Sequence, residues 1–190
     1  MKASFTPVAP DERDALIAFI AADTYPYNGT PQPTPAQVAS WLNTGLYTES
    51  FWITCEDGAR IGAMHYSNAS AVHAEVHIRL HRPYRGQGAG TQAVAWLTDY
   101  LFRTYPAKHR VEGWTRVDNT AMRRVFRHCG YVKQAHLRDD FVIESDENVE
   151  NGGRSGFMDK VGYGILRDDW RTKTITPVNW HDEDAIPEAR

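Results

Sequence analysis

A glycine-rich segment, residues 82–93, joins two stretches of different periodicity and constrains the fold more than any other part of the chain. It reads R-P-Y-R-G-Q-G-A-G-T-Q-A, follows an alternating strand-like run at residues 74–81, and precedes an apolar helical pattern at residues 93–97. Glycine lets the backbone turn tightly and approach a ligand closely, because it has no Cβ. The start of a helix leaves several N–H groups without intrahelical partners, and the helix dipole adds positive potential there. With the charge of Arg85, this strand–loop–helix unit predicts a site for a phosphorylated ligand.

Three phosphate-binding motifs compete for this segment. A Walker loop needs a lysine after its last glycine, and no lysine stands there. A dinucleotide fingerprint is met by Gly88, Gly90 and Ala93, but it needs an acidic residue at the end of the next strand, and Glu112 begins a strand-like run instead. The pyrophosphate loop of acetyl-coenzyme A transferases, [RQ]-x-x-G-x-[GA], is filled by Arg85, Gly88 and Gly90. A plain glycine-rich turn explains the glycines but not the place of Arg85, so we favour the third motif and keep the dinucleotide-binding oxidoreductase as a distant alternative.

The composition excludes several classes of protein. The formal net charge is −3, and no dense Lys/Arg stripe is present, which argues against nucleic acid as the main ligand. The sequence shows neither a secretory apolar segment at its start nor an apolar run of membrane-spanning length. Its two cysteines are too few for a disulfide framework and lack metal-ligand spacing. We therefore expect a cytoplasmic protein that binds no membrane and no metal, with one domain at residues 1–178 and a polar tail at residues 179–190.

Hydrophobic periodicity and turn residues predict the order of elements. We expect strands at residues 4–8, 51–55, 60–66, 74–80, 111–117, from 131 onward and at 159–166. We expect helices from about residue 11, from Thr34-Pro35 to about residue 45, from the glycine loop to about residue 105, and at residues 119–129. An acidic loop at residues 145–155 and a polar stretch after residue 166 complete the chain. This order, β-α-α-β-β-β-α-β-α-β-β, predicts an α+β fold with a mixed, mostly antiparallel sheet and helices on both faces.

The motifs and this order together resemble the GNAT superfamily of N-acetyltransferases, and most closely its RimJ/RimL-like branch. Residues 74–93 fit the pattern A-E-x-x-x-x-L followed by P-x-R-G-x-G-x-[GA]-T-x-A, and residues 116–131 and 163–170 resemble two further blocks of the branch. The likeness covers roughly residues 3–170 by order of elements. It implies a GNAT-like acyl-CoA N-acyltransferase fold, acetyl-CoA as co-substrate, and direct attack of a primary amine on the thioester; it allows a homodimer.

Two residues compete for the role of general base. Glu75 lies ten residues before Arg85, where enzymes of the RimL-like branch carry a matching glutamate. Strand alternation places Glu75, His77 and Arg79 on one face, which lines a cleft or meets solvent, and the apolar residues 76, 78 and 80 on the other, in the core. His77 is the rival because an imidazole titrates near neutral pH. The alternative is that Glu75 only forms an ion pair, with Arg79 or another cation. The histidines at positions 73, 77 and 81 are too far apart along a strand to share one metal ion.

The resemblance assigns a cofactor-binding set that extends beyond the glycine loop. This set comprises Leu80, Arg85, Gly86, Gln87, Gly88, Ala89, Gly90, Thr91, Asn119 and Arg123. Asn119 matches the asparagine that binds the pantetheine arm in relatives, although an asparagine here would also cap the following helix.

The sequence departs from the family at the acid that protonates the departing thiolate. Met122 occupies the position of the serine in the branch, and Phe126 that of the tyrosine in many other GNAT enzymes. Tyr131, Ser155, a water molecule or no acid at all remain open. Cys129, next to Gly130 at a helix end, is expected to be buried and not to act as a nucleophile.

The acceptor cannot be chosen from the sequence. Protein N-termini, free amino acids, polyamines and amino sugars are all compatible with it. Five aromatic residues are candidates to line an acceptor pocket, although scattered aromatics more often belong to the core: Tyr25, Tyr27, Trp41, Trp52 and Trp114. An inactive acyl-CoA-binding or regulatory module is the alternative to an enzyme.

Overall fold

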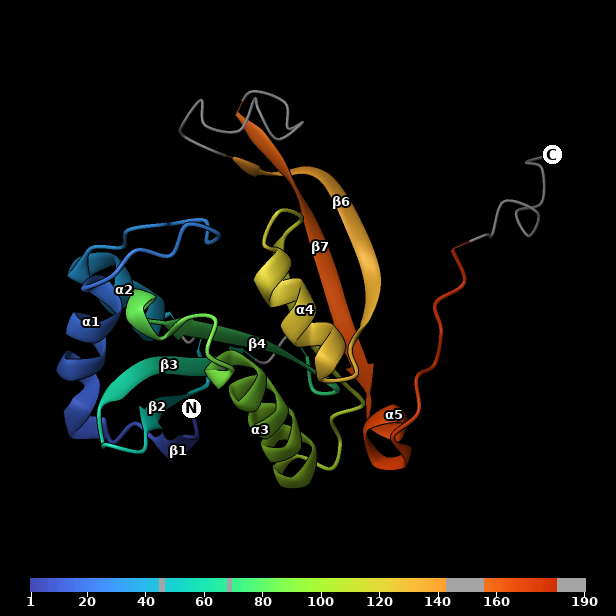
Figure 1. The fold of residues 1–190 in the computed structure, drawn as a ribbon, viewed down its shortest axis with the longest axis horizontal. Helices are drawn as coiled ribbons and strands as arrows, with labels where there is room; N and C mark the ends of the chain where they lie inside the picture. The colour runs from blue at the N-terminus through green and yellow to red at the C-terminus, as the bar shows by residue number, and fades with distance from the viewer. Residues whose placement is uncertain (45–46, 68–69, 143–155, 181–190) are drawn as a thin grey trace.

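The computed structural model describes residues 1–44, 47–67, 70–142 and 156–180 and confirms the expected order of the main elements (Figure 1). The strands are β1 (Ala3–Pro7), β2 (Glu49–Cys55), β3 (Arg60–Ser67), β4 (His73–Leu80), β5 (Arg110–Arg116), β6 (Val132–Val142) and β7 (Phe157–Leu166). The helices are α1 (Arg13–Ala21), α2 (Pro35–Asn43), α3 (Ala89–Thr104), α4 (Thr120–His128) and α5 (Arg167–Thr172), with short 3-10 turns η1 (Pro10–Glu12) and η2 (Arg82–Tyr84). The expected loop at residues 145–155 lies outside the described residues. None of the described helices is long and apolar enough to cross a membrane.

The seven strands form one sheet in the order β1-β2-β3-β4-β5-β7-β6. The pair β4–β5 is parallel and the other neighbouring strands are antiparallel, as predicted for a mixed sheet. Parallel pairing of β4 with β5 stops at Glu75 and Glu112, although β4 runs on to Leu80 and β5 to Arg116. The two strands therefore separate in the middle of the sheet.

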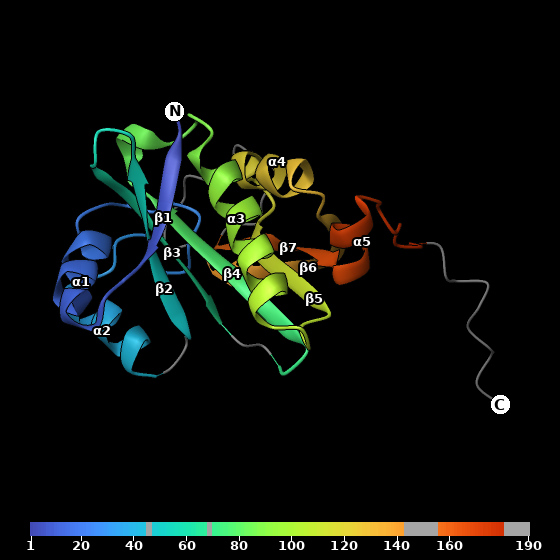
Figure 2. The same ribbon diagram turned by 90° about the horizontal axis from the view of Figure 1, so that it is seen from below.

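The helices cover both faces of this sheet (Figure 2). Helices α1 and α2 pack on the face that carries Trp52 and Ala63, and the buried residues Ile20 and Val38 join them there. Helices α3 and α4 pack on the opposite face, where Phe51 and Leu97 belong to the larger core. The separation of β4 from β5 therefore lies between two helical layers.

Two features of the fold differ from the sequence analysis. The sequence analysis assigned no helix to the polar stretch after residue 166, but the short helix α5 follows β7 directly there. Asp168 and Asp169 stand in its first turn, where acidic residues are favourable, and the Trp170 ring packs 5.3 Å from the ring of Phe102.

The second difference is the burial of Arg79, which the division of β4 into a polar cleft face and an apolar core face did not predict. Arg79 is buried, with 8 % of its surface exposed, whereas Ile78 and Leu80 are only partly buried. Arg79 pairs in register with Ala63 and so lies on the face that α1 and α2 cover. Strand alternation gives the face of a residue, but it does not say which helix lies above it.

Candidate active site

The glycine loop links β4 to α3 through backbone conformations that favour glycine. Gly86 has φ +75°, and Gly88, the N-cap of α3, has φ +88°. Gly88 provides no side-chain hydrogen bond to the helix start, so the first N–H groups of α3 remain directed toward the loop. An ideal Cβ on Gly88 would meet only the Gln92 side chain, at 4.0 Å, and would otherwise point into open space. This cradle of backbone donors can bind a phosphate group, as the sequence predicts.

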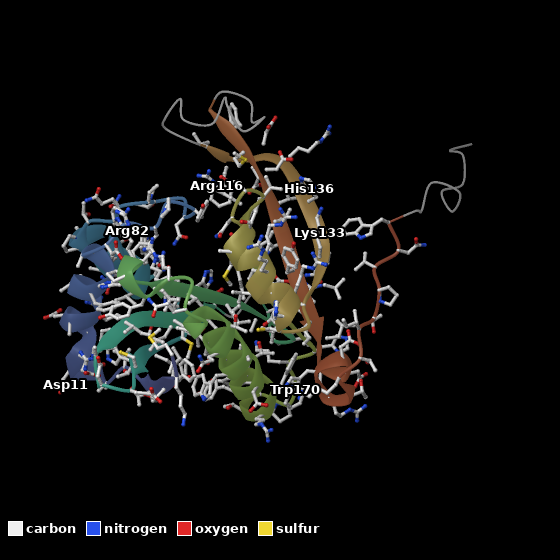
Figure 3. All side chains as sticks on the ribbon, in the orientation of Figure 1. Asp11, Arg82, Arg116, Lys133, His136 and Trp170 are labelled. Atoms are coloured by element: carbon white, nitrogen blue, oxygen red, sulfur yellow. The ribbon has the colours of Figure 1, made fainter. Side chains whose placement is uncertain are left out.

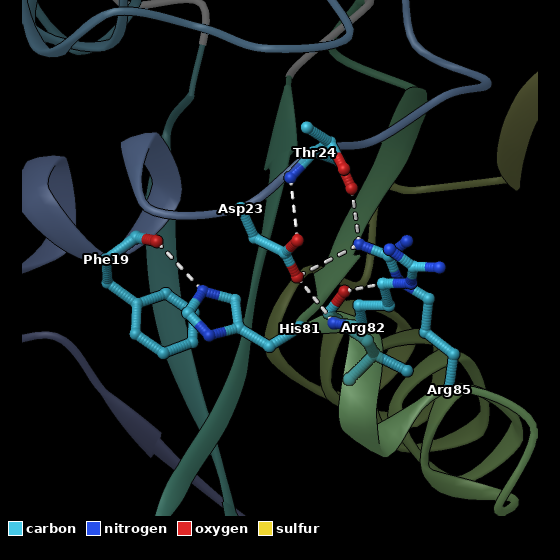
Figure 4. Close-up of polar contacts among 7 residues, drawn as sticks. Phe19, Asp23, Thr24, His81, Arg82 and Arg85 are labelled. Atoms are coloured by element: carbon cyan, nitrogen blue, oxygen red, sulfur yellow. Dashed lines mark hydrogen bonds and ion pairs between the residues drawn. The ribbon is translucent and has the colours of Figure 1, made fainter.

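Arg85 connects this loop to the segment between α1 and α2 (Figure 4). Its Nε donates to the Leu80 carbonyl at 2.8 Å, and its Nη2 donates to the Thr24 carbonyl at 2.6 Å and to Asp23 Oδ2 at 3.2 Å. Asp23 also accepts from the backbone N–H of Arg82. Burial alone would raise the pKa of the Asp23 carboxyl, but the backbone donors of Arg82 and Thr24 and the charge of Arg85 hold it below its ordinary value. Asp23 therefore fastens the α1–α2 segment to the glycine loop.

A cavity of about 460 Å³, here called the larger cavity, opens between the glycine loop, the end of β4 and α4. Seven of the predicted cofactor-binding residues line it: Leu80, Arg85, Gly86, Gly88, Gly90, Thr91 and Asn119. Three predicted residues do not. The Gln87 side chain donates to the Pro83 carbonyl, Ala89 is fully buried in the core, and Arg123 bonds to the Val117 carbonyl and the Tyr163 hydroxyl.

The neighbouring residue Arg124 lines the larger cavity instead of Arg123, and His128 joins it. Successive residues of a helix point about 100° apart, so Arg123 and Arg124 face different directions, and here Arg124 lines the cavity. A helical-wheel projection of α4 would have separated Arg124 from Arg123 only if the face of α4 that carries Val125 had been known to line the cavity.

Asn119 caps α4, which is one of the two roles considered for it. Its Oδ1 accepts the backbone N–H of Met122 at 3.1 Å, which caps α4, and its Nδ2 donates to Thr115 Oγ1 at 2.9 Å. It also lines the larger cavity and a second one. The cap holds the Asn119 side chain at the junction between the two.

The second cavity, about 260 Å³ and here called the smaller cavity, lies across the separation of β4 and β5. Residues that line both cavities mark where they meet: Tyr27, Asn28, Ile78, Arg79, Asn119 and Met122. Glu75, Trp114 and Lys160 line the smaller cavity alone. Alternate backbone amides of β4 beyond Glu75 face this gap, because β5 no longer pairs with the strand there.

Glu75 and His77 lie side by side in the smaller cavity, with Oε1 of Glu75 3.7 Å from Nε2 of His77. Burial, followed by the negative charge of Glu112, raises the pKa of the Glu75 carboxyl above its ordinary value, and Lys160 opposes this effect. Burial and the charge of Arg79 lower the pKa of His77 to about 4. His77 is therefore neutral near pH 7 and a weak base, whereas the raised pKa makes Glu75 a stronger base than an ordinary carboxylate.

The residues considered for thiolate protonation and covalent catalysis lie mostly away from the cavities. Tyr131 is 3 % exposed and its hydroxyl lies 2.6 Å from that of Thr98, in the core. Phe126 is an exception, since it lines the smaller cavity and also fills the place where a Cβ on Gly113 would stand. Burial raises the pKa of Cys129 to about 11, as expected for a thiol that is not a nucleophile. Ser155 lies outside the described residues.

The aromatic set divides between pocket and core. Tyr27 lines both cavities, Tyr25 the larger one and Trp114 the smaller one. Trp52, with 2 % exposure, belongs to the core under α1, and Trp41 packs against the same core. No three His, Cys, Asp or Glu side chains in the described ranges are grouped so as to hold a metal ion.

Comparison with known proteins identifies the fold to which this geometry belongs. A spermidine N-acetyltransferase from Vibrio cholerae, solved with CoA and spermine, is 17 % identical over 89 % of this chain and 98 % of its own, with TM-score 0.67. The ribosomal-protein-S5-alanine acetyltransferase from Vibrio fischeri is 17 % identical over 90 % and 96 %, with TM-score 0.65. A GNAT-family acetyltransferase from Bacillus anthracis is 13 % identical over 88 % and 96 %, with TM-score 0.68. At these identities the three structures share the fold.

The family itself is shown by the sequence. No curated protein matches the chain closely. Residues 4–132, more than half of the chain, match the family described as "Acetyltransferase (GNAT) domain", and this match includes the strands β1 to β5, the glycine loop and α4. With its mixed sheet, its separating central strands and its glycine cradle, the chain belongs to the GNAT acetyltransferase family and is an N-acetyltransferase.

Proposed function

We propose that this chain is a RimJ/RimL-like enzyme that transfers the acetyl group of acetyl-CoA to a primary amine by direct attack, with Glu75 as the general base. One observation carries the proposal. Glu75 is the single carboxylate among the described residues that line the smaller cavity, and it lies on the same face of β4 as Arg79, which lines both cavities. An amine that enters from the smaller cavity can therefore give its proton to Glu75, directly or through water.

The remaining residues have supporting roles. When bound, acetyl-CoA supplies a thioester carbonyl that an amine can attack. The first turn of α3, Gly86, Gly88 and Arg124 hold the pyrophosphate, and Asn119 holds the pantetheine arm. Backbone amides of β4 that face the gap stabilise the negative charge that develops on the carbonyl oxygen. Lys160, 3.2 Å from Asp140, keeps a positive charge beside Glu75 and limits how far its pKa rises.

The Glu75→Gln variant tests the assignment of the base. We expect turnover to fall by about 100-fold or more, the usual contribution of a positioned base, while the KM for acetyl-CoA stays unchanged. Release of CoA thiol, followed with a panel of primary amines, measures both. Glu56→Gln, an exposed glutamate in the β2–β3 turn, is the matched control and should behave as the wild type.

The result also separates the enzyme from an inactive binding module. Turnover of Glu75→Gln at the wild-type rate, in a folded variant, would remove Glu75 from the mechanism. Tight CoA binding by the wild type without turnover of any amine in the panel would support the module, which the positions of Met122 and Phe126 favour.

A further inference from the structure

Arg79 is a buried cation that has no carboxylate partner among the described residues. Its Nη1 donates to the Tyr47 hydroxyl at 3.3 Å and to His65 Nε2 at 3.1 Å. Its guanidinium carbon lies 5.2 Å from the ring centre of Trp41 and 5.6 Å from that of Tyr25. Aromatic faces and neutral acceptors stabilise the charge only in part.

Arg116 provides the comparison within the same chain. It is buried to the same degree, 8 % exposed, but it binds the Asp118 carboxylate with two donors, at 3.0 and 2.6 Å. Removing a cation from water is costly unless an anion and further hydrogen bonds replace the lost hydration. The described residues meet this requirement at Arg116, and at Arg79 they do not.

The groups around Arg79 are all able to donate a hydrogen bond. A guanidinium can only donate, so His65 Nε2 accepts and the imidazole proton stands on Nδ1. His65 Nδ1, Arg79 Nε and the Tyr25 hydroxyl are buried without a partner, and they are three of the four such side-chain atoms in the described parts of the chain. Of these residues, Arg79 and Tyr25 line the cavities and His65 lines neither, so a group that accepts hydrogen bonds and carries negative charge would complement the Arg79 guanidinium.

Arg79 places its positive charge on the acceptor side of the site. Arg79 lines both cavities, and Glu75 lies on the same face of β4, four residues earlier. The described charged side chains that line the smaller cavity are Glu75, Arg79 and Lys160. Two cations and one carboxylate do not suit a polycation, and a cavity of about 260 Å³ suits a small acceptor.

We propose that the acceptor is a small amine that also carries a carboxylate, such as a free amino acid, and that Arg79 binds this carboxylate while the amine meets Glu75. Tyr25, whose ring centre lies 5.6 Å from the guanidinium carbon and whose buried hydroxyl has no partner among the described residues, adds a second donor. The inference rests on the proposed acetyltransferase function and adds the class of its acceptor.

Matched acceptors test the inference with the wild-type enzyme. The panel contains glycine, 4-aminobutyrate, 6-aminohexanoate and phenylalanine, each beside its carboxamide, with spermidine and phosphoethanolamine for comparison. We expect kcat/KM for at least one acid to exceed that of its amide by about tenfold or more, as for a charge-assisted hydrogen bond.

The alternative outcomes are distinguishable. Equal rates for every acid and its amide, or spermidine or phosphoethanolamine as the best acceptor, overturn the inference and leave the acetyltransferase function standing. Absence of turnover with every amine overturns the proposed function and this inference with it.

Three variants locate the effect. Arg79→Met should abolish the preference for the acid while the KM for acetyl-CoA stays unchanged. Tyr25→Phe keeps the ring over the guanidinium, so it remains informative if Arg79→Met does not fold, and it should raise the KM for the acid but not for the amide. Arg60→Met is the control, because Arg60 also stacks on a tryptophan, 4.1 Å from the ring centre of Trp52, but pairs with Glu12. Retention of the full preference in both Arg79→Met and Tyr25→Phe contradicts the inference.

Discussion

The two cavities that meet at the separation of β4 and β5 are built from different kinds of structure. Much of the larger cavity is formed by one continuous segment, from the end of β4 to the first turn of α3, and its main donors are backbone N–H groups. The smaller cavity is assembled from side chains of the α1–α2 segment, β4, β5, α4, β6 and β7. With the donor and acceptor sites as proposed, the acetyl donor is specified largely by one local segment, whereas the acceptor depends on contacts between distant parts of the sequence.

The largest expected effect comes from a substitution in the glycine loop, the local segment that forms much of the larger cavity. Gly88→Val places a β-branched residue at φ +88° in the lining of the larger cavity. We expect kcat/KM for acetyl-CoA to fall by about 100-fold with every acceptor, because both the strain and the added side chain act on the cradle. Steady-state kinetics with varied acetyl-CoA measure the loss.

Gly58→Val separates strain from function. Gly58 has φ +84° in the β2–β3 turn, and an added Cβ there meets no atom within 4 Å. It should carry the same cost in stability, about 1–3 kcal/mol, and leave the kinetics unchanged. If Gly88→Val lost stability as Gly58→Val does but kept its KM for acetyl-CoA, the larger cavity would not be the donor site.

The same contrast explains what the sequence could and could not predict. The glycine loop and the N-cap of α2 at Thr34, whose side chain accepts from Gln37, are local features, and both were predicted. The burial of Arg79 was not, because Trp41 and Tyr25 that cover it lie 38 and 54 positions earlier in the chain. The choice of Arg124 over Arg123 depends on how α4 is rotated against the sheet. The short helix α5 is stabilised by packing of Trp170 against Phe102, a contact between residues that are distant in the sequence.

A smaller effect is expected at Asp23, which connects the α1–α2 segment to the glycine loop. Asp23→Asn replaces a carboxylate that accepts from Arg82, Arg85 and Thr24 with an amide that has one acceptor oxygen. Because Asp23 fastens the acceptor-side segment to the glycine loop, we expect the KM for both acetyl-CoA and the amine to rise, by about tenfold. Kinetics with each substrate varied in turn measure the two changes.

Asp11→Asn is the matched control for this variant, since Asp11 is exposed at the edge of the molecule (Figure 3). A rise in only one of the two KM values would show that Asp23 serves one cavity and does not join them. The pKa of Asp23 lies below its ordinary value, so its stabilising contribution is present above the pKa of an unfolded aspartate and is lost as the pH falls through the folded-state pKa. Asp23→Asn should remove this part of the acid sensitivity.

The smallest expected effect is a displacement of the pH–rate profile without a large change in its maximum. Glu75 must be deprotonated to accept a proton, so kcat/KM rises with pH through its pKa. Glu112 raises that pKa and Lys160 lowers it. Glu112→Gln should therefore move the acidic limb to lower pH, and Lys160→Gln should move it to higher pH. General destabilisation would not displace the acidic limb in opposite directions in the two variants. If His77 were the base, Glu112→Gln would leave the acidic limb in place, because Glu112 does not perturb the pKa of His77. Glutamine at position 112 keeps an oxygen for Arg110, 2.7 Å from the carboxylate, so the sheet should stay intact and the limb alone should report on Glu75.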